Sequence, residues 1–335
     1  MPSRDQFRGC LVGQALGDAL GFMVEGQPPE ICRGYIEEKL GQGEAGGNRR
    51  NPFAFGQYSD DTQLARELMQ SYVARGRFDS EDYAHRIAAI FSEDRIVGRG
   101  RSTEEAARRL ALGVPWDEAG TPPPSAGNGS AMRAGPIGLL YHDDPEGLIQ
   151  AATDQGIITH ADPRCSAGAI AIAGAVALSL RGRPVKPAPF LAYLAELVEK
   201  VESRFAAFLM RLERCLPLPP EEAVTRISEE GLESEPAHKW RGISPFVVGS
   251  VLWSLYSFLR SPEDYRETIR TAIAVGGDVD TTAAMAGTIS GARLGLDAVP
   301  PNLSRCLTDR GTGGLVELTE LADECYERKC GGSRL

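Results

Sequence analysis

Apolar positions recur three and four residues apart over most of the chain. The segment 61–75 carries Leu64, Leu68, Met69 and Tyr72 at these intervals, which is the pattern of a helix with one buried face. Strict alternation of apolar and polar residues, the pattern of a half-buried strand, is hard to find anywhere in the sequence. The sequence therefore predicts an all-α fold.

Similar patterns predict many more helices of medium length, joined by short loops. Their boundaries carry Ser or Pro at the start and Gly or Pro at the end. The predicted helices cover residues 7–24, 80–91, 102–112, 145–157, 166–180, 189–214, 220–230, 245–259, 262–273 and 281–294. Helices of the same character lie on both sides of the Pro-rich run 121–125. We therefore expect one compact domain over residues 1–325, followed by a loose tail at 326–335.

The first predicted helix carries one stripe of small residues. Gly9, Gly13, Gly17 and Gly21 are spaced by four, so another backbone can approach this face closely. Membrane helix pairs use the same spacing, but Asp18 argues against a membrane span here. The longest apolar run, at 165–180, is shorter than the roughly 20 residues that cross a bilayer. We therefore expect no association with a membrane.

Charge and cysteine content narrow the class of protein further. A net charge of −10 argues against a protein whose main partner is a nucleic-acid backbone, because such proteins present a basic face. The seven cysteines form no CxxC pair, which is typical of reduced thiols in a cytoplasm. We expect a cytoplasmic protein that acts as a monomer.

Two acidic motifs stand directly before predicted helices. Ser59, Asp60 and Asp61 precede one helix, and Asp278, Asp280 and Thr281 precede another. Neighbouring side chains can converge at a helix start, and carboxylate and hydroxyl oxygens suit a hard cation. Either motif alone could be an ordinary helix cap, in which the negative charges stabilise the helix by interacting with the positive end of its dipole. Because two such clusters occur without a competing Cys or His motif, they favour one shared site for Mg²⁺ or Mn²⁺.

A third motif is rich in glycine and precedes another predicted helix. It supplies flexible backbone amides, a hydroxyl and a guanidinium, which together suit a phosphate; its residues are Gly127, Asn128, Gly129, Ser130, Ala131, Met132 and Arg133. A plain loop entering a helix is the alternative. His160 lies among polar residues ahead of an apolar helix, and Glu25 ends the glycine-striped helix. Neither residue is distinctive by itself.

In this order, the motifs resemble those of the ADP-ribosylglycohydrolase family, which includes the dinitrogenase reductase-activating glycohydrolases and the ADP-ribosyl-acceptor hydrolases. The likeness covers residues 8–295, from the glycine-striped helix through the acidic cluster, the GNGSAMR loop and the Thr159-His160 segment to GGDVDT. It implies an all-α bundle of many helices around a cleft that holds two divalent ions, Mg²⁺ or Mn²⁺.

The resemblance also implies roles for individual residues. The metal ligands would be Ser59, Asp60, Asp61, Asp278, Asp280 and Thr281, while Gly127 to Arg133 and His160 would hold ADP-ribose. Asp60 or Asp61 would orient or deprotonate a water, with Glu25 as a nearby acid. Ser59 stands where the family usually has Thr, and it keeps the hydroxyl.

The function implied by the resemblance is hydrolysis of the glycosidic bond between ADP-ribose and an acceptor, either a protein side chain or a small ADP-ribosyl compound. A di-metal phosphohydrolase that cuts the diphosphate would use the same oxygen ligands. A non-catalytic ADP-ribose-binding or structural relative is the third possibility, and the complete set of ligand residues argues against it. The acceptor linkage stays open among arginine, serine, an O-acetyl ester, a polymer and a nucleic-acid end.

Overall fold

The computed structural model describes residues 1–41, 50, 52–182, 184–232 and 240–331. Within these ranges the chain forms α-helices and short 3-10 turns, and its β-type pairs are isolated bridges that build no sheet. The predicted all-α fold is confirmed.

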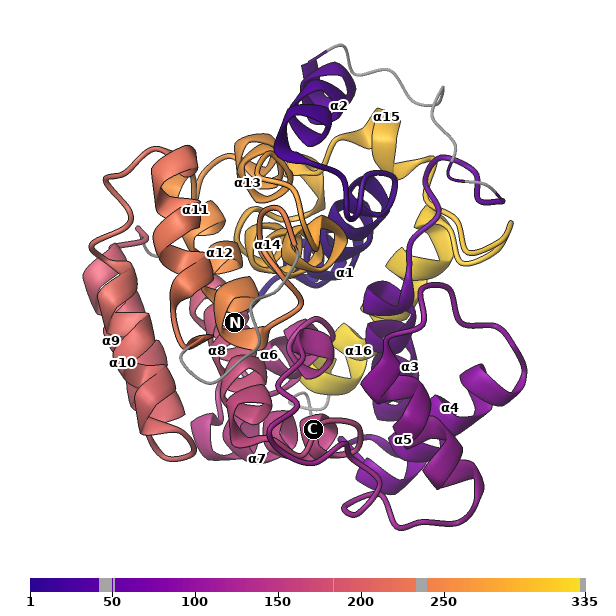
Figure 1. Cartoon of the computed structure of the whole chain (residues 1–335). Coiled ribbons are helices and arrows are strands. Elements are labelled where there is room, and N and C mark those ends of the chain that lie inside the picture. Colours follow the sequence, from indigo (N-terminus) through magenta and orange to yellow (C-terminus); the bar gives the residue numbers. More distant parts are fainter. Residues whose placement is uncertain (42–49, 51, 183, 233–239, 332–335) are drawn as a thin grey trace.

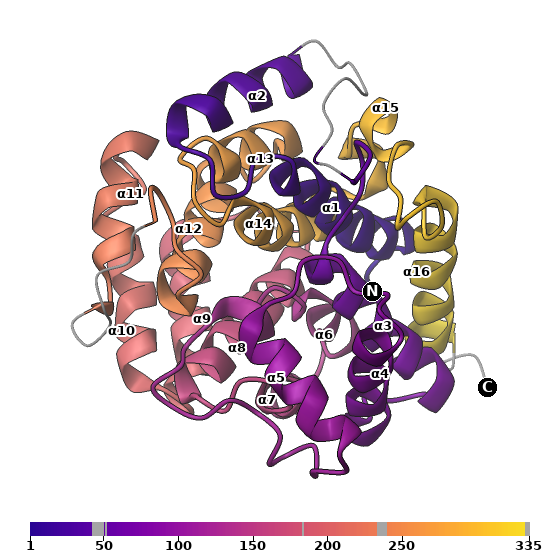
Figure 2. The same cartoon turned by 45° about the vertical axis from the view of Figure 1, so that its right-hand side comes forward.

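The helices form layers around a central pair, α1 (Arg4–Phe22) and α14 (Val279–Leu294). Figure 1 shows α9 to α12 on one side of this pair and α3 to α5 on the other, and the turned view in Figure 2 agrees. The remaining bounds are α2 (Pro29–Gly41), α3 (Asp60–Arg75), α4 (Ser80–Ser92), α5 (Arg101–Ala111), α6 (Gly135–Leu140), α7 (Pro145–Ile157), α8 (Pro163–Ser179), α9 (Pro187–Glu199), α10 (Ser203–Leu212), α11 (Pro220–Glu229), α12 (Val247–Arg260), α13 (Tyr265–Ile273), α15 (Pro301–Ser304) and α16 (Leu315–Cys330).

The glycine stripe of α1 packs directly against the backbone of α14. A Cβ atom at Gly17 would lie 2.2 Å from the carbonyl oxygen of Ala283, and one at Gly13 would lie 2.6 Å from that of Gly287. At the end of the stripe, a Cβ at Gly21 would lie 2.4 Å from the Cα of Asp280. The close approach expected from the sequence is therefore present, and it brings the end of α1 against the start of α14.

Most helix ends lie within three residues of the predicted ones, but α2, α15 and α16 were not among the predicted helices. Two further differences concern predicted segments. The segment 189–214 forms two helices, because the side chain of Glu202 accepts a hydrogen bond from the amide of Arg204 and caps a new helix there. The tail is also helical over 326–330, where α16 continues to Cys330. The ring of Tyr326 packs edge-on against Phe7, with centroids 5.4 Å apart. Residues 332–335 lie outside the described part of the chain.

The apolar helix α8 is an interior helix. Most of its residues are buried, from Cys165 to Ser179. In the described ranges, no helix has both the length and the apolar character that a bilayer span requires.

Candidate active site

The two acidic motifs meet although 220 residues separate them. The hydroxyl of Thr281 donates a hydrogen bond of 3.5 Å to Oδ2 of Asp61. The starts of α3 and α14 thus form one wall of a cavity of about 520 Å³, which Asp60, Asp61, Asp278, Asp280 and Thr281 line together with Glu25. Ser59 lies beside this wall and is buried.

Asp18, in the middle of α1, holds the start of α3 in place. Its fully buried carboxylate accepts hydrogen bonds from the backbone amides of Ser59 and Thr62, at 2.9 and 3.0 Å, and from both of their hydroxyls, at 2.8 and 2.6 Å. These are the free amides that every helix start must satisfy. At the sequence level, Asp18 was used only as evidence against a membrane span. A charged residue on a helix with a close-packed glycine stripe must find partners in the interior, and this was the sequence signal for a structural role of Asp18.

Gln14, one turn earlier in α1, ties the same region to the glycine-rich loop. Its amide nitrogen donates hydrogen bonds of 3.0 Å to the carbonyl oxygens of Asp61 and Met132. Helix α1 therefore positions both the first acidic motif and the loop opposite it.

The carboxylate of Asp61 fits a cation ligand. Its Oδ2 accepts from the hydroxyl of Ser59 at 3.0 Å, but Ser59 has one hydrogen and also lies 2.8 Å from Asp18. Its other oxygen, Oδ1, is buried and has no hydrogen-bond partner among the described residues. A buried anionic oxygen without a donor is costly unless a positive charge lies nearby. The oxygen atoms present here therefore fit the ligand set of a hard, oxygen-preferring ion such as Mg²⁺.

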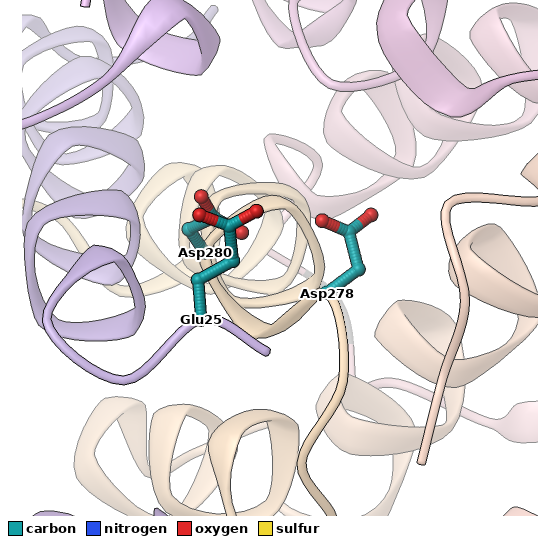
Figure 3. Close-up of side chains that lie close together, drawn as sticks. All are labelled: Glu25, Asp278 and Asp280. Carbon is teal, nitrogen blue, oxygen red and sulfur yellow. The ribbon is translucent and has the colours of Figure 1, made fainter. Parts of the chain in front are cut away.

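A second group of carboxylates lies at the start of α14. Glu25, Asp278 and Asp280 each offer an oxygen within 4.8 Å of the others, and Figure 3 shows the three side chains extending toward the same side of the helix. Glu25 also accepts a hydrogen bond of 2.8 Å from Arg50. That pairing offsets part of the negative charge at the mouth of the cavity.

The cluster carries more negative charge than its surroundings balance. Burial raises the pKa of Asp278 to about 6. Burial, followed by repulsion from nearby carboxylates, raises the pKa values of Asp60 and Asp280 well above the usual range. Like charges in one buried site cannot all ionise without a counter-ion. Bound cations would supply that counter-charge.

The glycine-rich loop contributes only part of its predicted set to the cavity. Gly127, Asn128, Gly129 and Met132 line it, and the Asn128 amide donates a hydrogen bond of 2.5 Å to Asp278. The loop forms a single 3-10 turn at Asn128–Ser130, and the next helix begins only at Gly135. The motif thus precedes a helix, as expected, but forms a turn of its own first, and phosphate binding by this loop stays a prediction.

Three residues of the loop point into the protein interior. The hydroxyl of Ser130 donates to the carbonyl of Cys165 at 2.9 Å, and Ala131 is fully buried. The Arg133 guanidinium is also fully buried, where it donates to Gln155 and Thr159. Contrary to the sequence interpretation, Arg133 does not line the cavity.

His160 does face the cavity, although 97% of its surface is buried. Its Nδ1 lies 2.7 Å from the hydroxyl of Thr159. Burial, with a smaller effect from Arg133, lowers the pKa of His160 to about 3. The ring is therefore neutral near pH 7.

Another part of the cavity wall was missed at the sequence level. The segment 98–103 runs into the first turn of α5 and lines the cavity. A Cβ at Gly98 or Gly100 would lie 2.9 or 3.6 Å from a carboxylate oxygen of Asp60, whereas Arg99 and Arg101 pair with glutamates on the exposed side of α5. The sequence of this segment, GRGRST, resembles the glycine-rich loop in being flexible, polar and placed before a helix. That likeness was the signal that could have identified it.

Comparison with known proteins relates the chain to one family over nearly its whole length. The family model of the ADP-ribosylglycohydrolases matches residues 1–333. The chain is similar to ADP-ribosylhydrolase ARH3 of Gallus gallus, with 32% identity over 98% of this chain and 95% of that protein. It is also similar to ADP-ribosylarginine hydrolase Tri1 of Serratia proteamaculans, with 24% identity over 94% of this chain and 79% of the relative.

A solved structure extends the comparison to the fold. The chain superposes on an ADP-ribosylglycohydrolase-related protein complex with a TM-score of 0.72 and 28% identity, covering 97% of this chain and 98% of the other. The residues covered by the family model include both acidic motifs and the loop that faces them. The chain therefore belongs to the ADP-ribosylglycohydrolase family.

Proposed function

We propose that this protein is a metal-dependent hydrolase that cleaves the glycosidic bond between ADP-ribose and an acceptor. The observation that carries the proposal is the convergence of carboxylates from the turn after α1 and from the starts of α3 and α14 on one wall of a single cavity. The names of the relatives, ADP-ribosylhydrolase and ADP-ribosylarginine hydrolase, supply the substrate class.

Two divalent ions, Mg²⁺ or Mn²⁺, would occupy the acidic wall. Ser59, Asp60 and Asp61 would hold them from α3, and Asp278, Asp280 and Thr281 from α14. The unpartnered Oδ1 of Asp61 and the mutual repulsion of the carboxylates support this assignment. Such ions supply Lewis-acid polarisation and lower the pKa of a bound water.

The protein's own groups stabilise the charge that develops during cleavage. Departure of the acceptor creates an oxocarbenium-like centre, and fixed carboxylates at the cavity wall stabilise positive charge there. Asp60 or Asp61 would orient a water, and the bonds from Asp18 and Gln14 that hold the start of α3 against α1 support this role. Glu25 lies at the mouth of the cavity, paired with Arg50.

The opposite wall would hold the ADP-ribose. Gly127 and Gly129 lack side chains, so a ligand can approach the backbone closely, and the ring of His160 lies directly beside both glycines. Asn128 connects this wall to the acidic one through its bond to Asp278. A ligand between the walls would meet carboxylates on one side and glycine backbone on the other.

The proposal is tested by product analysis. The purified protein, with Mg²⁺ or Mn²⁺, is incubated with arginine-linked and serine-linked ADP-ribosyl peptides of the same sequence, and the products are separated by chromatography. We expect free ADP-ribose from at least one linkage and none after chelation of the metal. Release of AMP would instead indicate a phosphohydrolase. No release from either peptide, or from an O-acetyl ester of ADP-ribose, would support a non-catalytic relative.

A further inference from the structure

Arg133 lies outside the cavity but contacts a residue that orients the cavity wall. Its buried guanidinium donates hydrogen bonds of 2.8 Å to the side-chain oxygen and the carbonyl of Gln155. A third bond, also of 2.8 Å, reaches the hydroxyl oxygen of Thr159. Nε and Nη2 make these three bonds, whereas Nη1 has no acceptor among the described residues. The two short bonds from Nη2 fix the position of the Thr159 oxygen relative to Gln155.

The position of the Thr159 hydroxyl determines which way its hydrogen points. A guanidinium only donates, so the bond from Arg133 uses a lone pair of the Thr159 oxygen. The hydroxyl hydrogen then needs an acceptor, and Nδ1 of His160 lies 2.7 Å away. Thr159 is fully buried. If Nδ1 carried the proton instead, the hydroxyl hydrogen would be buried without an acceptor in the described part of the chain, which costs free energy.

His160 consequently has one defined protonation state. The ring is neutral near pH 7, so it carries a single proton. Because Nδ1 accepts from Thr159, that proton belongs on Nε2.

Nε2 lies at the edge of the cavity. A Cβ at Gly129 would lie 3.1 Å from this atom, and one at Gly127 would lie 3.4 Å from it. Over the ranges that the structure describes, no protein group is found bonded to Nε2, whereas Nδ1 is bonded to Thr159. The ring therefore turns its unpaired N–H edge toward the space between the two glycines.

We propose that Thr159, held by Arg133, is a positioning residue that fixes His160 as the neutral Nε2–H tautomer, so that the ring offers a hydrogen-bond donor to an oxygen of the ligand. This inference deepens the proposed function and rests on it for the identity of the ligand, ADP-ribose. The tautomer itself does not depend on the ligand.

Nitrogen NMR tests the tautomer directly. The protein is labelled with ¹⁵N-histidine and measured at pH 7 without ligand, and the His160 signals are identified by their loss in His160→Asn. We expect a protonated Nε2 and an unprotonated Nδ1, which resonate at clearly different shifts. A protonated Nδ1 in the wild-type protein would overturn the inference, and this measurement requires no variant at Thr159.

Two substitutions at Thr159 test its role. Thr159→Val removes the hydroxyl and keeps the shape, so His160 should lose the preference for Nε2–H and show a mixture of tautomers. Thr159→Ser keeps the hydroxyl and should restore the wild-type spectrum. An unchanged Nε2–H tautomer in Thr159→Val would show that Thr159 does not fix the ring. Should Thr159→Val fail to fold, the proposal is tested by the wild-type and Thr159→Ser spectra, both of which must show the Nε2–H tautomer of His160.

Calorimetry with ADP-ribose links the tautomer to binding. We expect Thr159→Val to weaken the affinity roughly threefold to tenfold, as for loss of one hydrogen bond, with Thr159→Ser near wild type. A Thr159→Val affinity equal to wild type, with its tautomer changed, would overturn the donor role of His160. If the wild-type protein does not bind ADP-ribose at all, the proposed function fails, while the spectra still decide whether Thr159 positions the ring.

Discussion

Asp18 of α1 accepts two hydrogen bonds from Thr62 of α3, one from its backbone amide at 3.0 Å and one from its hydroxyl at 2.6 Å. The same carboxylate binds the amide and hydroxyl of Ser59. A residue in the middle of one helix thus serves as the cap of another. The geometry of the first acidic motif depends on a side chain more than 40 positions away in the sequence.

Asp18→Asn should therefore destabilise the protein. An amide can accept at one side only, and its NH₂ would face the amide and hydroxyl donors of α3, leaving some of them unpaired in a fully buried site. We expect a loss of about 2–3 kcal/mol in the free energy of unfolding, measured by denaturant titration. Asp264→Asn, at the N-cap of α13, is the matched control, because Asn caps helices about as well as Asp. Equal stability of both variants would contradict the role given to Asp18.

Neutral replacements in the acidic wall should abolish turnover and leave the fold intact. Asp60→Asn and Asp280→Asn each remove one anionic ligand with little change in size. We expect the hydrolysis rate to fall by at least about a hundredfold, while circular dichroism stays that of the parent. Asp264→Asn, which lies outside the cavity, again serves as the control variant. If either variant hydrolyses at the parent rate with saturating Mg²⁺, the shared ion site is excluded.

Binding of divalent ions should stabilise the protein more at pH 7 than at pH 5. Burial raises the pKa of Asp278 to about 6 in the metal-free fold, above the value of about 3.9 expected for unfolded Asp. Protonation thus stabilises the metal-free fold at low pH, and this contribution is lost as the pH rises through 6. Ions that bind the ionised carboxylates compete with these protons.

Calorimetric melting temperatures with EDTA and with saturating Mg²⁺ measure this effect at both pH values and constant ionic strength. We expect a rise on adding Mg²⁺ at pH 7, as mass action requires, and a smaller rise at pH 5. A rise of equal size at the two pH values would show that proton and ion do not share these carboxylates.

A side chain at Gly129 should obstruct the ligand wall. Its Cβ would lie 2.7 Å from Cε1 of His160, so the loop or the ring must move. We expect Gly129→Val to weaken ADP-ribose binding at least tenfold, equivalent to about 1.4 kcal/mol, as measured by calorimetry. Gly34→Val in α2 is the matched control, since a Cβ there meets no atom within 4 Å. Parent-like affinity in Gly129→Val would remove this loop from the binding site.

The sequence by itself determined the helical fold and the chemistry of the acidic wall. The three- and four-residue spacing of apolar side chains reflects which helix face is buried, and this is a local property. The stripe at Gly13 and Gly17 likewise required a close neighbour, which the structure identifies as α14. Ser59 to Asp61 and Asp278 to Thr281 were recognisable because their oxygen atoms are adjacent in the chain.

Only the tertiary structure decided what each polar side chain contacts. Arg133 was expected to face the ligand, yet α7 and the turn that follows it pack beside its loop and supply Gln155 and Thr159 as partners inside the protein. Asp18 likewise acquires its role because α3 starts beside α1. Local patterns set helix faces and turns, but hydrogen bonds between residues far apart in sequence depend on how the helices pack. The residues that position the site without lining it, such as Asp18, could therefore be identified only in the folded protein.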